Sequence, residues 1–240
     1  DNFGGQIKLP YSTGLIWSYC LQNKTIKDNY DLKGWFYKRE SAEDILKKIH
    51  NPDVIALSNF VWNTQLNHKL AKEIKKKYPK CKVIFGGLGN PNKNRLDNFL
   101  EENDYIDMIV NGEGELTFEH ILIESLKDEP NYKNVEGIST KDFITNDRQR
   151  IKDIDSMPSP YLDGLFDKLT LSSDETFEAP IESVRGCPYQ CTFCEIGDKY
   201  FQKIVRQSNK KVFAELDWIS KNKIDFVYNA DSNFGLLQEH

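Results

Sequence analysis

Three of the five cysteines in the 240-residue sequence lie close together, as Cys187, Cys191 and Cys194. The spacing C-x3-C-x2-C allows three thiolates to converge from one loop, and Gly186 and Pro188 favour a bend around the first of them. Three sulfur ligands suit an iron–sulfur cluster, zinc or copper better than magnesium or calcium. The segment therefore indicates a site for a soft metal.

Two other uses of these cysteines stay open from the residues alone. A disulfide would leave one of the three unpaired, and nothing else in the sequence is typical of a secreted protein. A structural zinc site needs four ligands, and no His or Cys lies between Cys194 and His240 to complete it locally. An iron–sulfur cluster held by three cysteines leaves one iron open to a substrate or cofactor, which is the chemically useful arrangement.

The run from Arg185 to Cys194, RGCPYQCTFC, resembles the signature of the radical S-adenosylmethionine enzymes, CxxxCxxC with an aromatic residue before the last cysteine. That aromatic residue is Phe193, whose backbone the resemblance places against the adenine of S-adenosylmethionine. The resemblance also implies that the three cysteines hold a 4Fe-4S cluster and that S-adenosylmethionine chelates its fourth iron. Reductive cleavage would then release a 5′-deoxyadenosyl radical. No side chain is assigned as catalytic.

The composition is that of a chain with a packed core. The net charge is -5 at pH 7, and hydrophobic residues make up 39% of the sequence. The negative charge argues against a dedicated nucleic-acid-binding protein, and the lack of a long apolar run argues against a membrane span. Without a secretory leader, a cytoplasmic location is expected. Cys20 and Cys81 stand apart from the motif and are expected to be buried apolar residues.

Residues 1 to about 125 alternate apolar runs with amphipathic helices, which is the pattern of a parallel sheet covered on both faces. Ser41 and Asp44 predict a capped helix start. Strands are expected at 54–60, 83–85 and 105–110. Ligands bind at the carboxyl ends of such strands. Three turns follow these ends: Ser58-Asn59-Phe60, Gly86 to Gly89, and Gly112-Glu113-Gly114-Glu115.

The order of these turns resembles the cobalamin-binding domain, whose pattern is DxHxxG, then SxL, then GG. Ser58-x-Phe60 corresponds to SxL, and Gly86-Gly87 follows at close to the family interval. Counting back, residues 9–14 (LPYSTG) correspond to DxHxxG. Gly14 matches, whereas Tyr11 stands in place of the histidine that would ligate cobalt. The resemblance assigns these residues to cobalamin: Tyr11, Gly14, Ser58, Asn59, Gly86, Gly87, Gly112, Glu113 and Gly114.

The missing histidine distinguishes two versions of this domain. A site with a histidine below cobalt is not expected, because a phenol is a poor cobalt ligand and none of His50, His68 or His120 lies in the right turn. Related radical proteins bind cobalamin without a protein nitrogen below cobalt, and this is the expectation here. Others keep the fold without cobalamin, so that alternative stays open.

A second domain is expected to contain the cysteine motif. Residues 180–184 form a strand that feeds the cysteine loop, and a helix at 204–219 and a strand at 224–228 follow. The turn after that strand, NADSNF, resembles the polar turn that positions the amino group of S-adenosylmethionine, which assigns Asp231 and Asn233 to this cofactor. A plain helix-capping turn is the alternative.

The predicted fold is α/β. Residues 1–130 are expected to form a Rossmann-like (flavodoxin-like) parallel-sheet domain, residues 131–165 a connector with a small hairpin, and residues 166–240 the start of a radical S-adenosylmethionine (β/α) partial TIM barrel. Because only two barrel strands are present and the sequence starts without methionine, it has the features of a fragment of a longer chain.

The resemblance implies a cobalamin-dependent radical methyltransferase acting on an unactivated carbon or phosphorus of a small-molecule or natural-product-like substrate. A flavodoxin or ferredoxin is the expected electron donor. Two alternatives stay open. One is a radical oxidation, cyclisation or rearrangement without methyl transfer, and the other is a cofactor-binding module without activity of its own.

Overall fold

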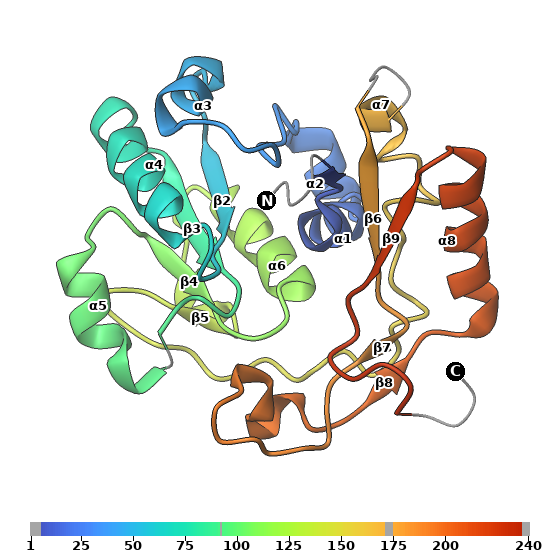
Figure 1. The fold of residues 1–240 in the computed structure, drawn as a ribbon. Coiled ribbons are helices and arrows are strands. Elements are labelled where there is room, and N and C mark those ends of the chain that lie inside the picture. Colours follow the sequence, from blue (N-terminus) through green and yellow to red (C-terminus); the bar gives the residue numbers. More distant parts are fainter. Residues whose placement is uncertain (1–5, 92, 171–174, 237–240) are drawn as a thin grey trace. The chain divides into compact units, whose positions relative to one another are not determined.

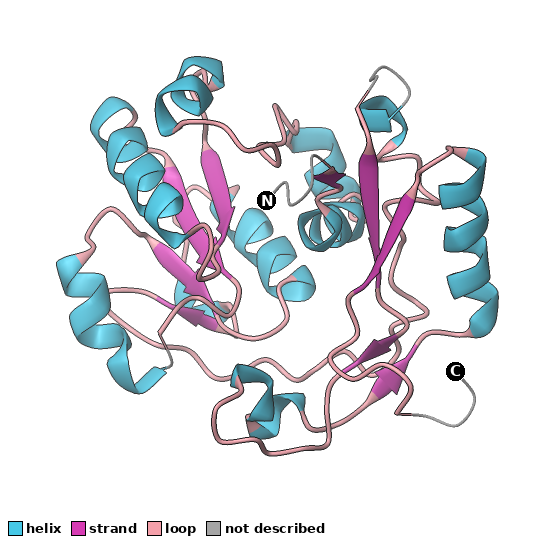
Figure 2. Ribbon diagram, in the orientation of Figure 1, coloured by secondary structure: helices cyan, strands magenta, loops and turns pink. Residues whose placement is uncertain are grey.

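The computed structural model describes residues 6–91, 93–170 and 175–236, which form two compact units. We call residues 1–38 with 150–240 the cysteine-loop unit, and residues 39–149 the four-stranded unit. Figure 1 traces both along the chain, and Figure 2 shows that each combines helices with strands. No helix among the described residues has the length and apolar character needed to cross a membrane.

The four-stranded unit is an α/β sheet with the strand order β2-β3-β4-β5, in which β2, β3 and β4 are parallel and β5 is antiparallel to β4. Its strands are β2 (Val54–Ser58), β3 (Lys82–Gly86), β4 (Met108–Val110) and β5 (Ile138–Ser139). Its α-helices are α3 (Ala42–Lys48), α4 (Thr64–Lys77), α5 (Leu96–Glu102) and α6 (Glu115–Ser125), with short 3-10 turns η1 (Lys93–Arg95) and η2 (Tyr132–Asn134).

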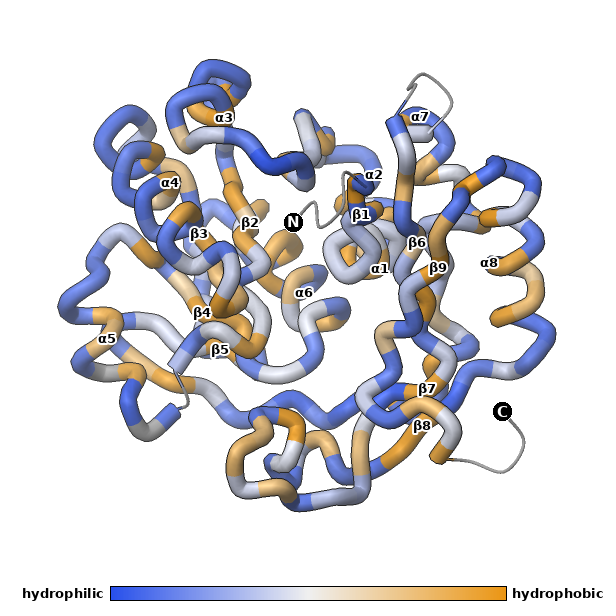
Figure 3. Tube along the Cα trace, in the orientation of Figure 1, coloured by the Kyte–Doolittle hydropathy of each residue, from blue (hydrophilic) through white to orange (hydrophobic). Residues whose placement is uncertain are grey.

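Alternate residues of β3 face two different cores, as the period of a strand requires. Val83 and Phe85 pack with side chains of α3, α4 and α5, whereas Ile84 packs with Ile121 of α6 and Ile138 of β5. Figure 1 shows these helices on the two faces of the sheet, and Figure 3 shows the hydrophobic residues along β2 and β4. The predicted Rossmann-like sheet is therefore confirmed.

The cysteine-loop unit contains a parallel sheet of order β1-β6-β9, formed by β1 (Ile7–Lys8), β6 (Phe177–Ile181) and β9 (Phe226–Asn229). A two-stranded antiparallel ladder joins β7 (Val184–Arg185) to β8 (Val205–Arg206). The helices are α1 (Tyr11–Cys20), α2 (Lys24–Asn29), α7 (Asp167–Thr170) and α8 (Asn209–Lys221), with 3-10 turns η3 (Glu195–Gly197) and η4 (Lys199–Phe201). The β6-α8-β9 segment is one βαβ unit, and a closed barrel is not formed by the described residues.

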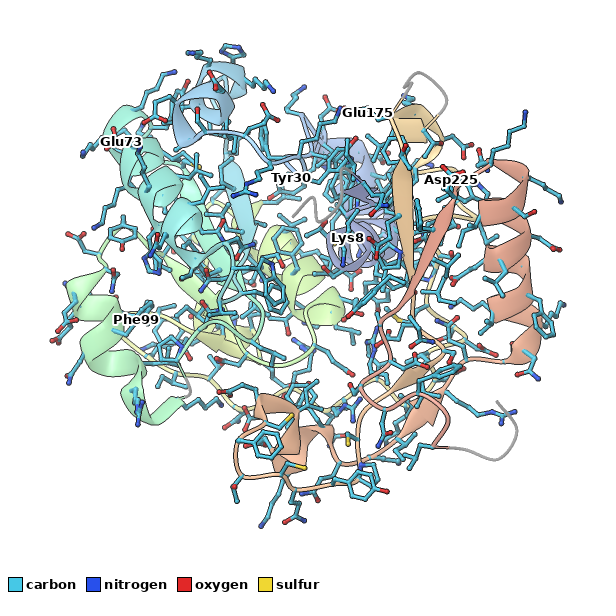
Figure 4. All side chains as sticks on the ribbon, in the orientation of Figure 1. Lys8, Tyr30, Glu73, Phe99, Glu175 and Asp225 are labelled. Atoms are coloured by element: carbon cyan, nitrogen blue, oxygen red, sulfur yellow. The ribbon has the colours of Figure 1, made fainter. Side chains whose placement is uncertain are left out.

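The amino-terminal segment belongs to the cysteine-loop unit, which differs from the expected domain of residues 1–130. Its apolar side chains Leu9 and Leu15 are buried against Phe166 and Phe177. Lys8, labelled in Figure 4, pairs with Glu178 of β6 at 3.4 Å and lies 4.1 Å from the ring centre of Tyr228 on β9. Its side chain thus reaches both other strands of this sheet. Residues 39–149, with the hairpin, form the four-stranded unit.

Several local predictions are confirmed. The hydroxyl of Ser41 accepts a hydrogen bond from the backbone N–H of Asp44 at 3.1 Å, as a helix cap does. The small hairpin exists, since β5 bridges Ile144. Cys20 and Cys81 are buried. The strand expected at 105–110 is limited to the three residues of β4, because Tyr105 is in a turn and residues 106–107 lie outside any helix or strand.

The position of Gly14 on α1 yields a stability prediction. A Cβ atom there would lie 2.5 Å from Cζ of the buried Phe166 and 3.0 Å from Cβ of Pro160. We expect Gly14→Ala to destabilise the cysteine-loop unit by about 1–3 kcal/mol through overpacking. Urea unfolding followed by tryptophan fluorescence would measure it, since three of the four tryptophans lie in this unit.

Gly34→Ala is the matched control, because its Cβ would meet nothing closer than Phe36 at 3.6 Å. An equal loss of stability in both variants would contradict overpacking as the reason for glycine at position 14.

Candidate functional site

The cysteine loop runs between β7 and β8, and the pairing of these strands holds its two ends together. Arg185 is paired with Val205, and the backbone N–H of Cys187 donates to the carbonyl of Phe201 at 2.9 Å. Gly186 has φ +104°, and a Cβ there would lie 2.6 Å from the carbonyl oxygen of Lys203. Only glycine fits this entry to the loop.

The loop also makes its own internal turns. The N–H of Cys194 donates to the carbonyl of Cys191 at 3.1 Å, and the N–H of Gly197 donates to the carbonyl of Cys194 at 2.9 Å. A Cβ on Gly197 would lie 2.6 Å from the carbonyl oxygen of Cys191. The backbone around the second and third cysteines is therefore closely folded and leaves no room for a side chain at position 197.

All three thiols are free. Cys187 is half-buried, whereas Cys191 and Cys194 are exposed, and the side chain of Phe193 is 90% exposed. Within the described residues, no three Cys, His, Asp or Glu side chains are gathered closely enough to hold a metal ion. The donor set nevertheless fits an iron–sulfur cluster, since the thiols are accessible, chemically soft and carried by one loop that both ends anchor.

The turn after β9 lies against the start of this loop. The carboxylate of Asp231 accepts hydrogen bonds from the backbone N–H groups of Ser183 at 2.6 Å and Val184 at 2.9 Å, and from the Ser183 hydroxyl at 2.5 Å. It also accepts a weaker one from the side chain of Asn229 at 3.3 Å. Asp231 therefore joins the end of β9 to the segment between β6 and β7.

The two residues assigned to S-adenosylmethionine differ in their surroundings. The carboxylate of Asp231 is engaged by four donors of the chain itself, so its acceptor capacity is largely used. The side-chain amide of Asn233 lies 3.8 Å from the sulfur of Cys187. Asn233 is thus the member of the pair that faces the cysteine loop.

The carboxyl edge of the four-stranded unit brings together the turns after β2 and β3. The buried side chain of Asn59 donates to Oδ1 of Asn90 at 3.1 Å and accepts from Nδ2 of Asn67 at 3.3 Å. Its backbone N–H donates to the carbonyl of Gly86 at 2.6 Å, and its carbonyl accepts from Gly89 at 2.9 Å. These bonds join the two turns into one frame.

Glycine is required at two positions of this frame. Gly87 has φ +93°, and its Cβ would lie 2.8 Å from the carbonyl oxygen of Asn59, while a Cβ on Gly89 would lie 2.7 Å from Cα of Phe60. Next to them, the rings of Phe60 and Trp62 stack with centres 4.7 Å apart, and Trp62 is 63% exposed. The turns after β2 and β3 are therefore closely packed against each other, and an aromatic pair with an exposed Trp62 lies beside them.

The other predicted cobalamin residues fall in two places. Ser58 ends β2 and Gly86 ends β3, and Gly112, Glu113 and Gly114 follow β4 and lead into α6, all in the four-stranded unit. Tyr11 and Gly14 belong instead to the cysteine-loop unit.

The burial of Tyr11 gives its position a packing role. Its ring stacks on that of Tyr161, with centres 5.6 Å apart. Burial, with a smaller contribution from nearby Glu215, raises the pKa of the Tyr11 hydroxyl well above its usual value. Its side chain is thus a neutral part of the core.

Sequence reasoning missed the amides of Asn63, Asn67 and Asn90. Asn63 donates to the carbonyl of Ser58 at 2.7 Å and accepts from the N–H of Phe60 at 2.8 Å. The available signal was the presence of these asparagines in turns and near a helix start, because Asn side chains commonly bond to nearby backbone in turns.

No family model matches the sequence. The cobalamin-dependent radical SAM methyltransferase TokK of Streptomyces tokunonensis is 32% identical over 236 residues, which are 95% of this chain and 34% of TokK. The 2-(S-pantetheinyl)-carbapenam-3-carboxylate methyltransferase of Streptantibioticus cattleyicolor is also 32% identical, over 95% of this chain and 34% of its own length. The chain thus spans about a third of the length of these curated relatives.

A solved structure supports the same fold. The cobalamin-dependent S-adenosylmethionine radical enzyme OxsB, with aqua-cobalamin and S-adenosylmethionine bound, superposes with a TM-score of 0.68 at 22% identity, over 96% of this chain and 32% of OxsB. Together with the sequence relatives, this confirms the resemblance first seen in the cysteine motif. Over nearly its whole length, the chain therefore resembles radical S-adenosylmethionine proteins that carry a cobalamin-binding-like domain.

Proposed function

We propose that this chain binds a 4Fe-4S cluster, S-adenosylmethionine and cobalamin, and that it forms these sites of an enzyme that methylates an unactivated carbon or phosphorus centre. The carrying observation is the cysteine loop, which presents three free thiols between β7 and β8, next to the turn that ends β9. The curated relatives named as methyltransferases support the choice of reaction. The substrate would be a small or natural-product-like molecule, and a flavodoxin or ferredoxin would supply electrons.

Each part of the cysteine-loop unit has a role in this proposal. Cys187, Cys191 and Cys194 would ligate the cluster, whose chemistry when bound is one-electron reduction of the sulfonium. The paired strands β7 and β8 hold the loop ends together, so that the three thiols would have to be brought together only within the loop. Phe193, exposed beside the third cysteine, is free to pack against an adenine.

The four-stranded unit would hold cobalamin at the carboxyl edge of its sheet. Gly87 and Gly89 allow the turns after β2 and β3 to pack closely against each other. The glycines at this edge leave backbone without side chains, which a flat macrocycle could approach closely. The three histidines of this unit are engaged or located elsewhere than at this edge. His68 shares a hydrogen bond of 2.6 Å with Tyr105, His120 lies 3.0 Å from Arg148, and His50 precedes β2, at the other end of that strand. This supports cobalamin binding without a histidine ligand.

The cysteine assignment predicts the metal content of the purified chain. Anaerobic reconstitution with iron and sulfide should give about four irons per chain and the brown colour of a 4Fe-4S cluster. Replacing the three motif cysteines by Ala should abolish iron binding, while circular dichroism shows a folded protein. Cys20→Ala is the matched control, because this buried cysteine lies in the same unit and should leave iron binding unchanged. A colourless protein that holds zinc would contradict the assignment.

The hydrogen bonds by which Asn59 joins the turns after β2 and β3 predict how cobalamin binding responds to mutation. Hydroxocobalamin should bind saturably under anaerobic conditions, with an absorption spectrum that lacks a histidine ligand. Asn59→Ala removes bonds to both Asn67 and Asn90. Without these bonds the turns are no longer held in place before cobalamin binds. If this makes the free energy of binding less favourable by about 1.4 kcal/mol, the affinity falls about tenfold.

Asn98→Ala is the matched control, because this asparagine is exposed on α5 in the same unit. Its affinity should equal that of the unsubstituted chain. Absence of saturable binding by the unsubstituted chain would refute the cobalamin part of the proposal and favour a radical enzyme that uses this unit as a scaffold.

A further inference from the structure

Hydrogen bonds to the backbone fix the two segments that carry Asn233 and Cys187. On one side, Ala230 donates to the carbonyl of Ile181 at 2.7 Å, and the Asp231 carboxylate binds the N–H groups of Ser183 and Val184. These bonds fix the turn from Asn229 to Asn233 against the carboxyl end of β6. The position of Asn233 thus follows from the fold of this turn.

On the other side, the backbone at the entry to the loop holds Cys187. Its N–H donates to the carbonyl of Phe201 at 2.9 Å, and it follows Gly186, whose conformation admits no side chain. Cys187 is half-buried, whereas the other two motif cysteines are exposed. A hydrogen bond to its sulfur is therefore better shielded from competing water than one to either of the others.

The side-chain amide of Asn233 lies 3.8 Å from the sulfur of Cys187, a distance suited to an N–H···S hydrogen bond. An amide N–H stabilises a sulfur more strongly as negative charge on that sulfur increases. One-electron reduction of a cluster adds one negative charge, shared by the cluster and its thiolate ligands. A donor aimed at a ligand sulfur therefore favours the reduced state and raises the reduction potential.

We propose that Asn233 is a positioning residue that donates a hydrogen bond to the cluster ligand Cys187 and raises the reduction potential of the cluster. This inference rests on the proposed cluster binding, and it gives Asn233 a role other than holding the amino group of S-adenosylmethionine. The electron comes from a low-potential one-electron donor. Asp231 supports this role by fixing the turn that carries Asn233.

The test measures the midpoint potential of the reconstituted 240-residue chain at fixed pH, without S-adenosylmethionine, from the EPR signal of the reduced cluster. Asn233→Ala removes the donor, and Asn233→Leu removes it while keeping four side-chain heavy atoms with the same branching. Both should lower the equilibrium constant for reduction by up to about tenfold, which is about 59 mV for one electron. Ser232→Ala, an exposed position in the same turn, is the matched control and should keep the original potential.

Iron content and the thermal unfolding midpoint are measured on the same samples. An unchanged potential in Asn233→Ala and Asn233→Leu, with full iron content, would overturn the inference while leaving the proposed function intact. Loss of iron from both variants but not from Ser232→Ala would also overturn it, because the amide would then hold the loop together without tuning the sulfur. If the unsubstituted chain takes up no cluster, the proposed function itself fails.

Discussion

The Asp231 carboxylate is the constraint on which the arrangement of the cysteine-loop unit depends. It accepts two backbone N–H groups and a hydroxyl from Ser183 and Val184, all within 2.9 Å. Hydrogen bonds to a charged acceptor contribute about 1.5–3 kcal/mol each, more than neutral ones. Such bonds decide the path of the chain where β6 ends and β7 begins, three residues before the first motif cysteine. The cysteine loop thus starts from a fixed point.

In the four-stranded unit, neutral amides fix the segments at the strand ends. Asn59 is fully buried, and its side chain is satisfied by Asn67 and Asn90 while its backbone bonds both Gly86 and Gly89. A carboxylate there would have no N–H to donate to Oδ1 of Asn90, whereas an amide offers both donors and acceptors. In both units a single polar side chain joins the carboxyl ends of neighbouring strands, which is the edge where parallel α/β folds bind ligands.

Local patterns in the sequence predicted much of this fold. The cysteine spacing, the helix cap at Ser41 and the strands around Val83 follow from neighbouring residues, and each is present. The place of the first strand did not follow. β1 has two residues, too few to show a period, and its partner Phe177 lies 170 positions later in the chain. The division into units depends on that distant pairing, so the expected boundary at residue 130 did not reproduce it.

The candidate site residues show the same contrast between what neighbouring elements determine and what distant parts of the chain determine. Turns such as Ser58-Asn59 and Gly86-Gly87 are set by the ends of adjacent parallel strands, so reading strand ends in order located them. Only their spacing from Ser58 indicates Tyr11 and Gly14, and the structure gives each a packing reason: a stacked, buried ring and a helix surface that touches Phe166. A buried neutral phenol keeps its proton and is a poor metal ligand. The segment that resembles a histidine-containing turn has therefore become part of the core of the cysteine-loop unit, and the absence of histidine there is consistent with that role.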